Sequence, residues 1–332
     1  MSSGIVWDPA GSDRQLAKAC MELRAGRTGL AREVLAESRW DFPLRGHRSL
    51  TLGSVVAARG EAEQWLTEAP NDPDACLLYA RVTLIRALRA ADTDDKRTPE
   101  LAQIADRACL RAAEADNTDP TPWVSMLALA RLGHKPVDPP MGLDTPGPWD
   151  LMSEVWQRDQ ESREGHHRLL SCFFARYGGS LDAMWQVAHW FGQWAPATSS
   201  AQILQLAALA EHYRVRRDSL NEHYRNRRDG AASDLAPDGQ WAAPQAVDIT
   251  RRIYDNWFFS VENKPGLVPV ADFSLLAHAL YMGQQEDLPR AARVLRAMSP
   301  YASSYPWSLF GDPAAVLTRA YGACRVPVPG AS

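Results

Sequence analysis

The residues best suited to chemistry gather between positions 149 and 194. His167 and His189 could act as a general acid or base, because imidazole titrates near neutral pH. Glu164 precedes His167 by three residues, so a helix would place both on one face, as in a Glu-x-x-His metal site. Asp159 could supply a further carboxylate. The chain has no second Glu-x-x-His and no His-x-x-x-His, so we expect no metal site.

The same region is rich in tryptophan. Residues four apart share a helix face, which aligns Trp185 with His189 and Trp190 with Trp194. Tryptophan is enriched at binding surfaces, where its ring is apolar and its indole N–H is a donor. The pattern leaves two interpretations open: an aromatic core of an irregular helical hairpin, or a ligand or partner surface formed by Trp156, Trp185, Trp190 and Trp194.

A charged segment is duplicated further along the chain. EHYRVRRD at residues 211–218 recurs as EHYRNRRD at residues 222–229. The shift of eleven residues is about three helical turns, so both copies would present one face of a long helix. Arginine binds phosphate and carboxylate groups bidentately, which makes this face a candidate for anion binding. The alternative is a solvated face whose acids neutralise its arginines. The candidate binding residues are Arg216, Arg217, Arg227 and Arg228.

Composition limits the classes of function. The 332 residues carry 36 basic and 40 acidic side chains, a formal net charge of −4, which gives no general attraction to nucleic acid or to an anionic membrane. Five dispersed cysteines without a C-x-x-C pair fit a reducing compartment. The chain shows no signal peptide, no apolar run long enough for a membrane span and no phosphate-binding or dinucleotide-binding motif. We therefore expect a cytoplasmic protein without a cofactor.

The elements that must position these residues are helices. Strand-type alternation is almost absent, whereas Ala, Leu, Arg, Glu and Gln run between Ser, Asp, Gly and Pro. The fold class predicted is all-α, built from successive helical hairpins. One helix should begin at Ser12 and stop at Gly26, and a second should begin at Thr28. Further helices are expected at residues 44–59, 61–68, 72–91, 99–115, 120–132, 149–160, 162–177, 181–194, 199–229, 245–260, 270–283, 287–298 and 312–323.

The segment ADRACLRAAEADNTDPTPWVSMLALARLG at residues 105–133 resembles the joint between two tetratricopeptide-type (TPR) repeats. The resemblance is best over residues 12–133, is faint over 270–323 and is absent between them. It implies a right-handed α-α superhelix of stacked helical hairpins with an irregular middle, which binds a protein or peptide in its concave groove. The residues that carry it are the small Ala105, Cys109 and Ala112, the turn Asp119-Pro120 and the aromatic Trp123.

Pro- and Gly-rich breaks divide the chain into four segments, which we expect to form one continuous structural unit. These are a TPR-like region at 1–133, a Pro-rich connector at 134–148, a Trp/His/Arg-rich helical middle at 149–230 and C-terminal helical hairpins at 231–332.

The leading functional hypothesis is a non-catalytic scaffold or adaptor that binds a partner protein or peptide through the Trp-rich middle. The alternative is a small-molecule tailoring enzyme of the secondary-metabolite type, or an enzyme subunit, with an aromatic pocket. His167, His189, Glu164 and Asp159 would then be catalytic, and an arginine would hold an anionic small molecule. A nucleic-acid-associated regulator comes third, because the basic stripe is short and few aromatic residues accompany it.

Overall fold

A computed structural model describes residues 4–226, 237–264 and 269–330. These residues form helices joined by turns and loops, and they contain isolated β-bridges but no β-strand. The all-α prediction is therefore confirmed for the described part of the chain. None of its helices is long and apolar enough to cross a lipid bilayer. Contacts divide the chain into two compact units: Ser12–Val187, called here the N-terminal unit, and Ala188–Ser332 together with Met1–Gly11, called the C-terminal unit.

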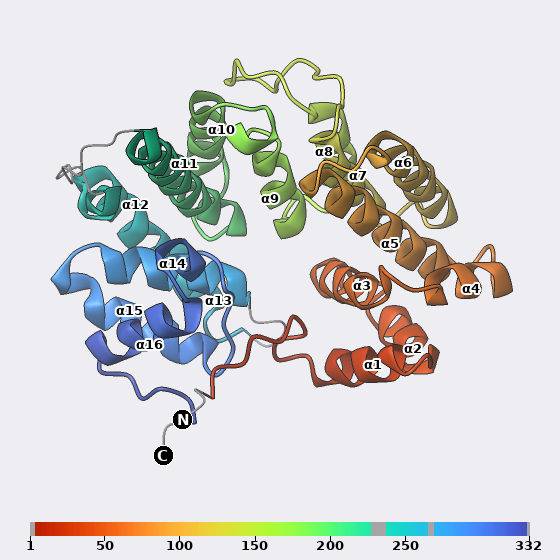
Figure 1. The fold of residues 1–332 in the computed structure, drawn as a ribbon, viewed down its shortest axis with the longest axis horizontal. Coiled ribbons are helices and arrows are strands. Elements are labelled where there is room, and N and C mark those ends of the chain that lie inside the picture. Colours follow the sequence, from red (N-terminus) through yellow and green to blue (C-terminus); the bar gives the residue numbers. More distant parts are fainter. Residues whose placement is uncertain (1–3, 227–236, 265–268, 331–332) are drawn as a thin grey trace. The chain divides into compact units, whose positions relative to one another are not determined.

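The N-terminal unit is a series of helices that pack in chain order (Figure 1). α1 packs on α2, α5 on α6 and α6 on α7. Every second helix also packs on the next, α1 on α3, α3 on α5, α5 on α7 and α7 on α9. The helices of this unit are α1 (Arg14–Arg24), α2 (Gly29–Glu37), α3 (Phe42–Val56), α4 (Glu61–Glu68), α5 (Pro73–Asp92), α6 (Thr98–Ala115), α7 (Thr121–Ala130), α8 (Trp149–Trp156) and α9 (Arg163–Ser171), followed by a short 3-10 turn, η1 (Ala175–Tyr177).

Capping residues explain why several of these helices begin where they do. The Asp13 carboxylate accepts a hydrogen bond from the Leu16 backbone N–H, and Asp41 accepts one from Leu44. Such bonds satisfy donors that the first turn of a helix leaves without a partner. Small residues then allow the helices to approach closely, because alanine and cysteine side chains fill little space. The core between α5, α6 and α7 contains the predicted small residues Ala105, Cys109 and Ala112. The other buried residues of this core are Cys76, Ala80, Leu84, Ala87, Ala108, Ala128 and Leu129.

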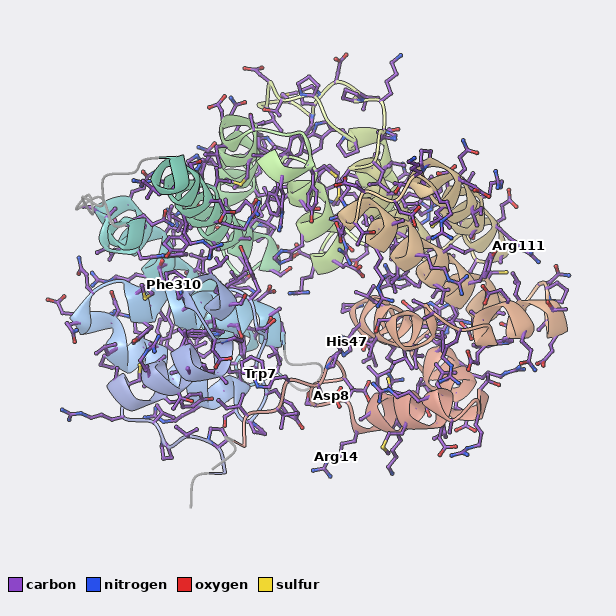
Figure 2. The ribbon with its side chains drawn as sticks, viewed as in Figure 1. Trp7, Asp8, Arg14, His47, Arg111 and Phe310 are labelled. Atoms are coloured by element: carbon purple, nitrogen blue, oxygen red, sulfur yellow. The ribbon has the colours of Figure 1, made fainter. Side chains whose placement is uncertain are left out.

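The C-terminal unit contains fewer regular helices and more aromatic packing. Phe310, labelled in Figure 2, lies in this unit, and its ring contacts those of Tyr213 and His278. Residues 4–11 belong to this unit, and the Val6 N–H donates to the Pro300 carbonyl. α10 (Leu181–Trp194) crosses the boundary between the two units. The other elements are η2 (Ser200–Ile203), α11 (Leu204–Asn226), η3 (Pro237–Ala242), α12 (Pro244–Ile253), the π-helix η4 (Tyr254–Phe258), α13 (Phe259–Val261), α14 (Val270–Met282), η5 (Gln285–Asp287), α15 (Leu288–Met298), η6 (Trp307–Phe310) and α16 (Pro313–Ala323).

Most predicted helix positions agree with the structure, but three predicted helices are interrupted. The helix expected at 162–177 ends at Ser171, and the chain reaches η1 only after Phe174, which is extended. The helix expected at 199–229 begins with the 3-10 turn η2. The helix expected at 245–260 contains the π-turn η4. Apolar periodicity cannot reveal a single inserted residue or a tightened turn, because neither changes which residue types are apolar. The four-segment organisation stays a prediction.

Candidate functional site

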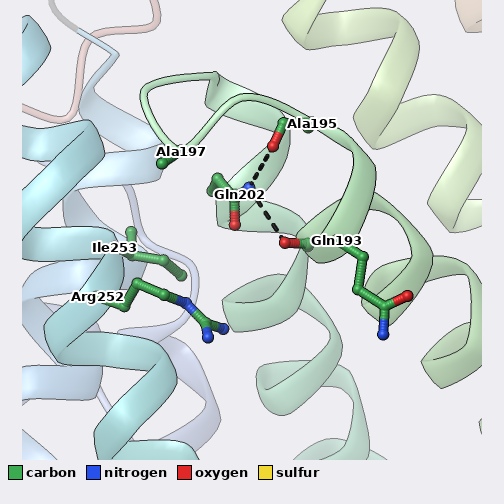
Figure 3. A pocket seen from close by; sticks show the side chains of 7 residues that line it. Gln193, Ala195, Ala197, Gln202, Arg252 and Ile253 are labelled. Carbon is green, nitrogen blue, oxygen red and sulfur yellow. Dashed lines mark hydrogen bonds between the residues drawn. The ribbon is translucent and has the colours of Figure 1, made fainter.

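A cavity of about 290 Å³ lies in the C-terminal unit, where α10 ends and α12 passes beside it (Figure 3). Arg252 of α12 faces Gln202 of η2 across this space in the close-up view. We call the cavity the Arg252 pocket. Its lining residues are Gly192, Gln193, Ala195, Ala197, Gln202, Arg252 and Ile253.

A directional chain of hydrogen bonds shapes this pocket. The Arg252 Nη2 donates to Gln205 Oε1 at 3.4 Å, and Gln205 Nε2 donates to Gln202 Oε1 at 3.1 Å. Gln202 Nε2 in turn donates to the Ala195 carbonyl at 2.9 Å, just beyond the last residue of α10. A helix end leaves carbonyl oxygens without partners, so the glutamine amide caps α10. The Gln205 and Gln202 amide groups both donate within this series of hydrogen bonds, and the series begins at the Arg252 guanidinium.

Gly192 leaves room for this chain of side chains. A Cβ atom at this position would stand 2.7 Å from the Gln205 side chain, which is closer than non-bonded atoms approach. Gln205 is almost fully buried, so it has little space into which to move. The glycine is therefore the residue that allows α10 to pack directly on the amide of Gln205.

The Arg252 guanidinium is exposed and makes no ion pair with any residue that the structure describes. Its position depends on the π-turn that follows immediately. The Asn256 side-chain amide donates to the Arg252 carbonyl at 2.9 Å, which holds the backbone where α12 widens into η4. Single π-turns within helices are frequent at functional sites. Arg252 therefore offers a cationic fork on a defined segment of backbone.

Two of the predicted tryptophans lie on α10, whose last turn contributes residues to the pocket lining. Trp194 is 60% exposed, and its ring centre is 6.2 Å from that of Trp190. Trp190 is partly buried and meets Phe191 edge to face, with ring centres 5.1 Å apart. Trp194 stands between the lining residues Gln193 and Ala195 in the chain, so Trp194 and the pocket share the last turn of α10, and Trp190 lies one turn earlier.

The other predicted tryptophans lie in the N-terminal unit. Trp156 Nε1 donates to His166 Nε2 at 3.2 Å, and the Trp156 ring centre is 6.5 Å from that of Trp149. Burial lowers the pKa of His166 to about 3, and the neighbouring His167 lowers it further. His166 is therefore neutral and can accept a hydrogen bond from the indole N–H. These contacts favour the aromatic-core interpretation for Trp156. Trp185 is partly buried on α10.

Glu164, one of the predicted acid–base residues, is paired with arginines. Burial alone would raise the pKa of Glu164, but the Arg81 and Arg168 guanidinium groups outweigh it and bring that pKa to about 2. Arg81 Nη2 lies 2.6 Å from Glu164 Oε2. A carboxylate held in this way favours a structural role over proton transfer.

The remaining acid–base candidates are Asp159, His167 and His189. Burial raises the pKa of Asp159, and its backbone hydrogen bond from Glu161 acts in the opposite direction. His167 and His189 are both partly buried, the first on α9 and the second on α10. Within the described parts of the chain, no group of three or more His, Cys, Asp or Glu side chains is arranged to hold a metal ion.

The duplicated arginine segment is only partly described. Arg217 Nη1 donates to the Leu309 carbonyl at 2.6 Å, and its Nη2 lies 3.0 Å from Asp218 Oδ1. These contacts favour the self-neutralised interpretation for Arg217. Arg216 is exposed on α11. Arg227 and Arg228, in the second copy, lie outside the described residues.

Sequence reasoning missed the Arg252 pocket and a set of buried arginines in the N-terminal unit. Arg252 lies in an ordinary amphipathic helix, and nothing in its neighbours marks it as different. One of the buried arginines does leave a signal, because Arg81 falls within a helical window of mostly apolar or small residues. An arginine on the buried face of a helix requires a carboxylate partner.

Comparison with known proteins identifies no relative: no family model matches the chain, and no curated protein and no solved structure matches it.

Proposed function

We propose that the protein is a non-catalytic scaffold of the cytoplasm that binds a partner polypeptide, with the Trp190/Trp194 pair as the centre of the binding surface. The observation that carries this proposal is the 60% exposure of Trp194, supported by the neighbouring Trp190 ring. A large apolar ring in water costs free energy that a partner recovers by covering it. Tryptophan is also among the residues that dominate binding energies at protein interfaces.

The architecture proposed is a TPR-like right-handed superhelix. Its support is the packing order of the N-terminal unit, where each helix contacts its neighbour and every second helix contacts the next. Stacked helical hairpins pack in this way, because one hairpin alone cannot bury its apolar face. The buried small residues of the 105–133 segment add to this support. The five cysteines form no disulfide among the described residues, and four of them are buried, which supports a reducing compartment.

The test is selection of peptides from a displayed random library on the full-length protein. Peptides that bind should lose at least about tenfold in affinity when Trp194 is replaced by alanine, because hot-spot truncations typically cost about 2 kcal/mol or more. Trp190→Ala should have a similar effect, with helicity checked by circular dichroism. The matched control is Trp40→Ala, since Trp40 is 77% exposed and lies in the N-terminal unit.

Two outcomes would overturn the proposal. The first is a selection that enriches no peptide above the background of an immobilised control protein. The second is a set of peptides that bind the Trp194→Ala and Trp190→Ala proteins as tightly as the unaltered protein. Equal losses in Trp194→Ala and Trp40→Ala would also contradict it, because the effect would then follow exposed tryptophan in general.

A further inference from the structure

We infer that the Arg252 pocket receives the side-chain carboxylate of an aspartate or glutamate in the bound polypeptide. This inference rests on the proposed function and adds the chemistry of the partner. Trp194 lies between the lining residues Gln193 and Ala195 in the chain, so a polypeptide that covers Trp194 has the pocket within reach of its next residues.

Most of the spare donors in the pocket's side-chain network belong to Arg252. Gln202 Nε2 donates to the Ala195 carbonyl, and Gln205 Nε2 donates to Gln202 Oε1. Arg252 has five N–H donors and uses one of them, on Gln205 at 3.4 Å. A cation with spare, fork-shaped donors and no ion pair among the described residues matches a carboxylate, which accepts two parallel hydrogen bonds.

The size of the pocket favours an entire side chain over a bare ion. About 290 Å³ is many times the roughly 30 Å³ that one water molecule occupies. The buried Ile253 supplies an apolar part of the lining for the methylene groups of an acidic side chain. The chain as a whole has a net charge of −4 and does not attract acidic partners in general. Selectivity for a carboxylate must therefore come from this one guanidinium.

The experiment is a double-substitution cycle between protein and peptide. From the library selection, a peptide that contains an acidic residue is synthesised with that residue as Glu, as Gln, and as Gln with a free rather than an amidated C-terminus. Affinities are measured by fluorescence anisotropy for the unaltered protein and for Arg252→Gln. The unaltered protein should prefer Glu over Gln by about tenfold, since a hydrogen bond to a charged group is worth about 1.5–3 kcal/mol.

In Arg252→Gln this preference should fall to about onefold, while the Gln peptide binds both proteins equally. Arg319→Gln is the matched control, because Arg319 is an exposed arginine of α16 in the same unit. Arg252→Glu should reverse the preference towards a peptide with Lys in place of Glu.

The outcomes separate this inference from the proposed function. If peptides depend on Trp194 but the Glu/Gln preference survives Arg252→Gln, the inference is wrong and the proposed function stands. The same conclusion follows if the preference is lost in Arg216→Gln or Arg319→Gln instead, or if only the free C-terminal carboxylate restores tight binding. If the selection yields no peptide, both fail.

Discussion

The two units of this chain bury different kinds of side chain. Both units bury tryptophan, phenylalanine and a histidine, but among the described residues only the N-terminal unit buries arginine, with carboxylate partners, and only the C-terminal unit buries tyrosine. Arg45 is fully buried, with its Nε 2.5 Å from Asp119 and its Nη2 2.8 Å from Asp74. Arg81, also fully buried, reaches Glu164 on α9. These pairs join residues that lie far apart in the sequence.

In the C-terminal unit, the buried histidine His278 lies among aromatic rings. Its ring centre lies 5.0 Å from that of Trp241, 5.1 Å from Trp307 and 4.6 Å from Phe310. Neither ring nitrogen of His278 has a hydrogen-bond partner among the described residues. Burial lowers the pKa of this histidine to about 3, so it is neutral at ordinary pH.

The difference shows that different kinds of contact make the packing specific in each unit. Alanine-rich helices offer small and similar faces, so a buried ion pair can discriminate between neighbouring helices by requiring a particular partner. Large aromatic rings select their arrangement by shape, and they tolerate polar atoms that lack partners only at a cost in free energy. Substitutions in the two units should therefore have different effects on stability.

The largest expected effect is on Arg45. Arg45→Met should destabilise the N-terminal unit by about 3–5 kcal/mol, because it leaves Asp74 and Asp119 buried without a cation. Hydrogen exchange followed by mass spectrometry measures this as faster exchange in α3 and α5, with α14 unchanged. Arg97→Gln is the control, since Arg97 forms an exposed pair with Asp95 and should leave exchange unaltered. Unchanged exchange in Arg45→Met would show that the buried pair does not stabilise the unit.

Acid should weaken both units. The pKa values of His166 and His278 are about 3 in the folded protein, below the ordinary value of 6.5. The unfolded chain therefore binds more protons as the pH falls, so stability that is present above about pH 6.5 is lost progressively down to about pH 3. Going from about pH 7.5 to about pH 5 should cost about 2 kcal/mol for each histidine. Denaturant unfolding at the two pH values measures the loss, and a constant midpoint would contradict it.

Replacing each buried histidine with phenylalanine should change the stability of the two units in opposite directions. His166→Phe leaves the Trp156 indole N–H without its acceptor and should cost about 1–3 kcal/mol. His278→Phe removes two ring nitrogens that have no partner among the described residues, so it should be neutral or stabilising by about 1 kcal/mol. It should also remove the acid sensitivity of the C-terminal unit. Thermal unfolding of the two variants measures the opposite signs, and equal losses would disprove the contrast.

The smallest expected effect concerns the π-turn of the C-terminal unit. Asn256→Ala removes the hydrogen bond to the Arg252 carbonyl and should cost about 0.5–1.5 kcal/mol. Faster hydrogen exchange confined to residues 250–260 would support this assignment. Asn256→Asp serves as a comparison, because it keeps the size of the side chain and removes the donor. If Asn256→Ala exchanges as slowly as the unaltered protein, the amide does not hold the turn.

Local signals in the sequence account for much of the helical pattern. Asp13 caps α1 at the predicted start, and the predicted bounds of α4 and α10 match the structure, whereas Asp41 caps α3 at Phe42, two residues before the predicted start. The sequence also singled out Trp190 and Trp194, although it could not tell an exposed ring from a buried one. It did not indicate Arg252, because the pocket forms from segments about 50 residues apart in the chain.

The amino-acid sequence by itself determined the class of fold and most helix positions, since capping, proline placement and apolar spacing act within a few residues. Only the tertiary structure decided that Arg45 is buried while Arg252 is exposed, and that Glu164 is paired with Arg81 rather than with a histidine. The physical reason is that burial and ion pairing depend on which distant segments meet. A side chain's charge is written in the sequence, but the water and partners around it are set by packing.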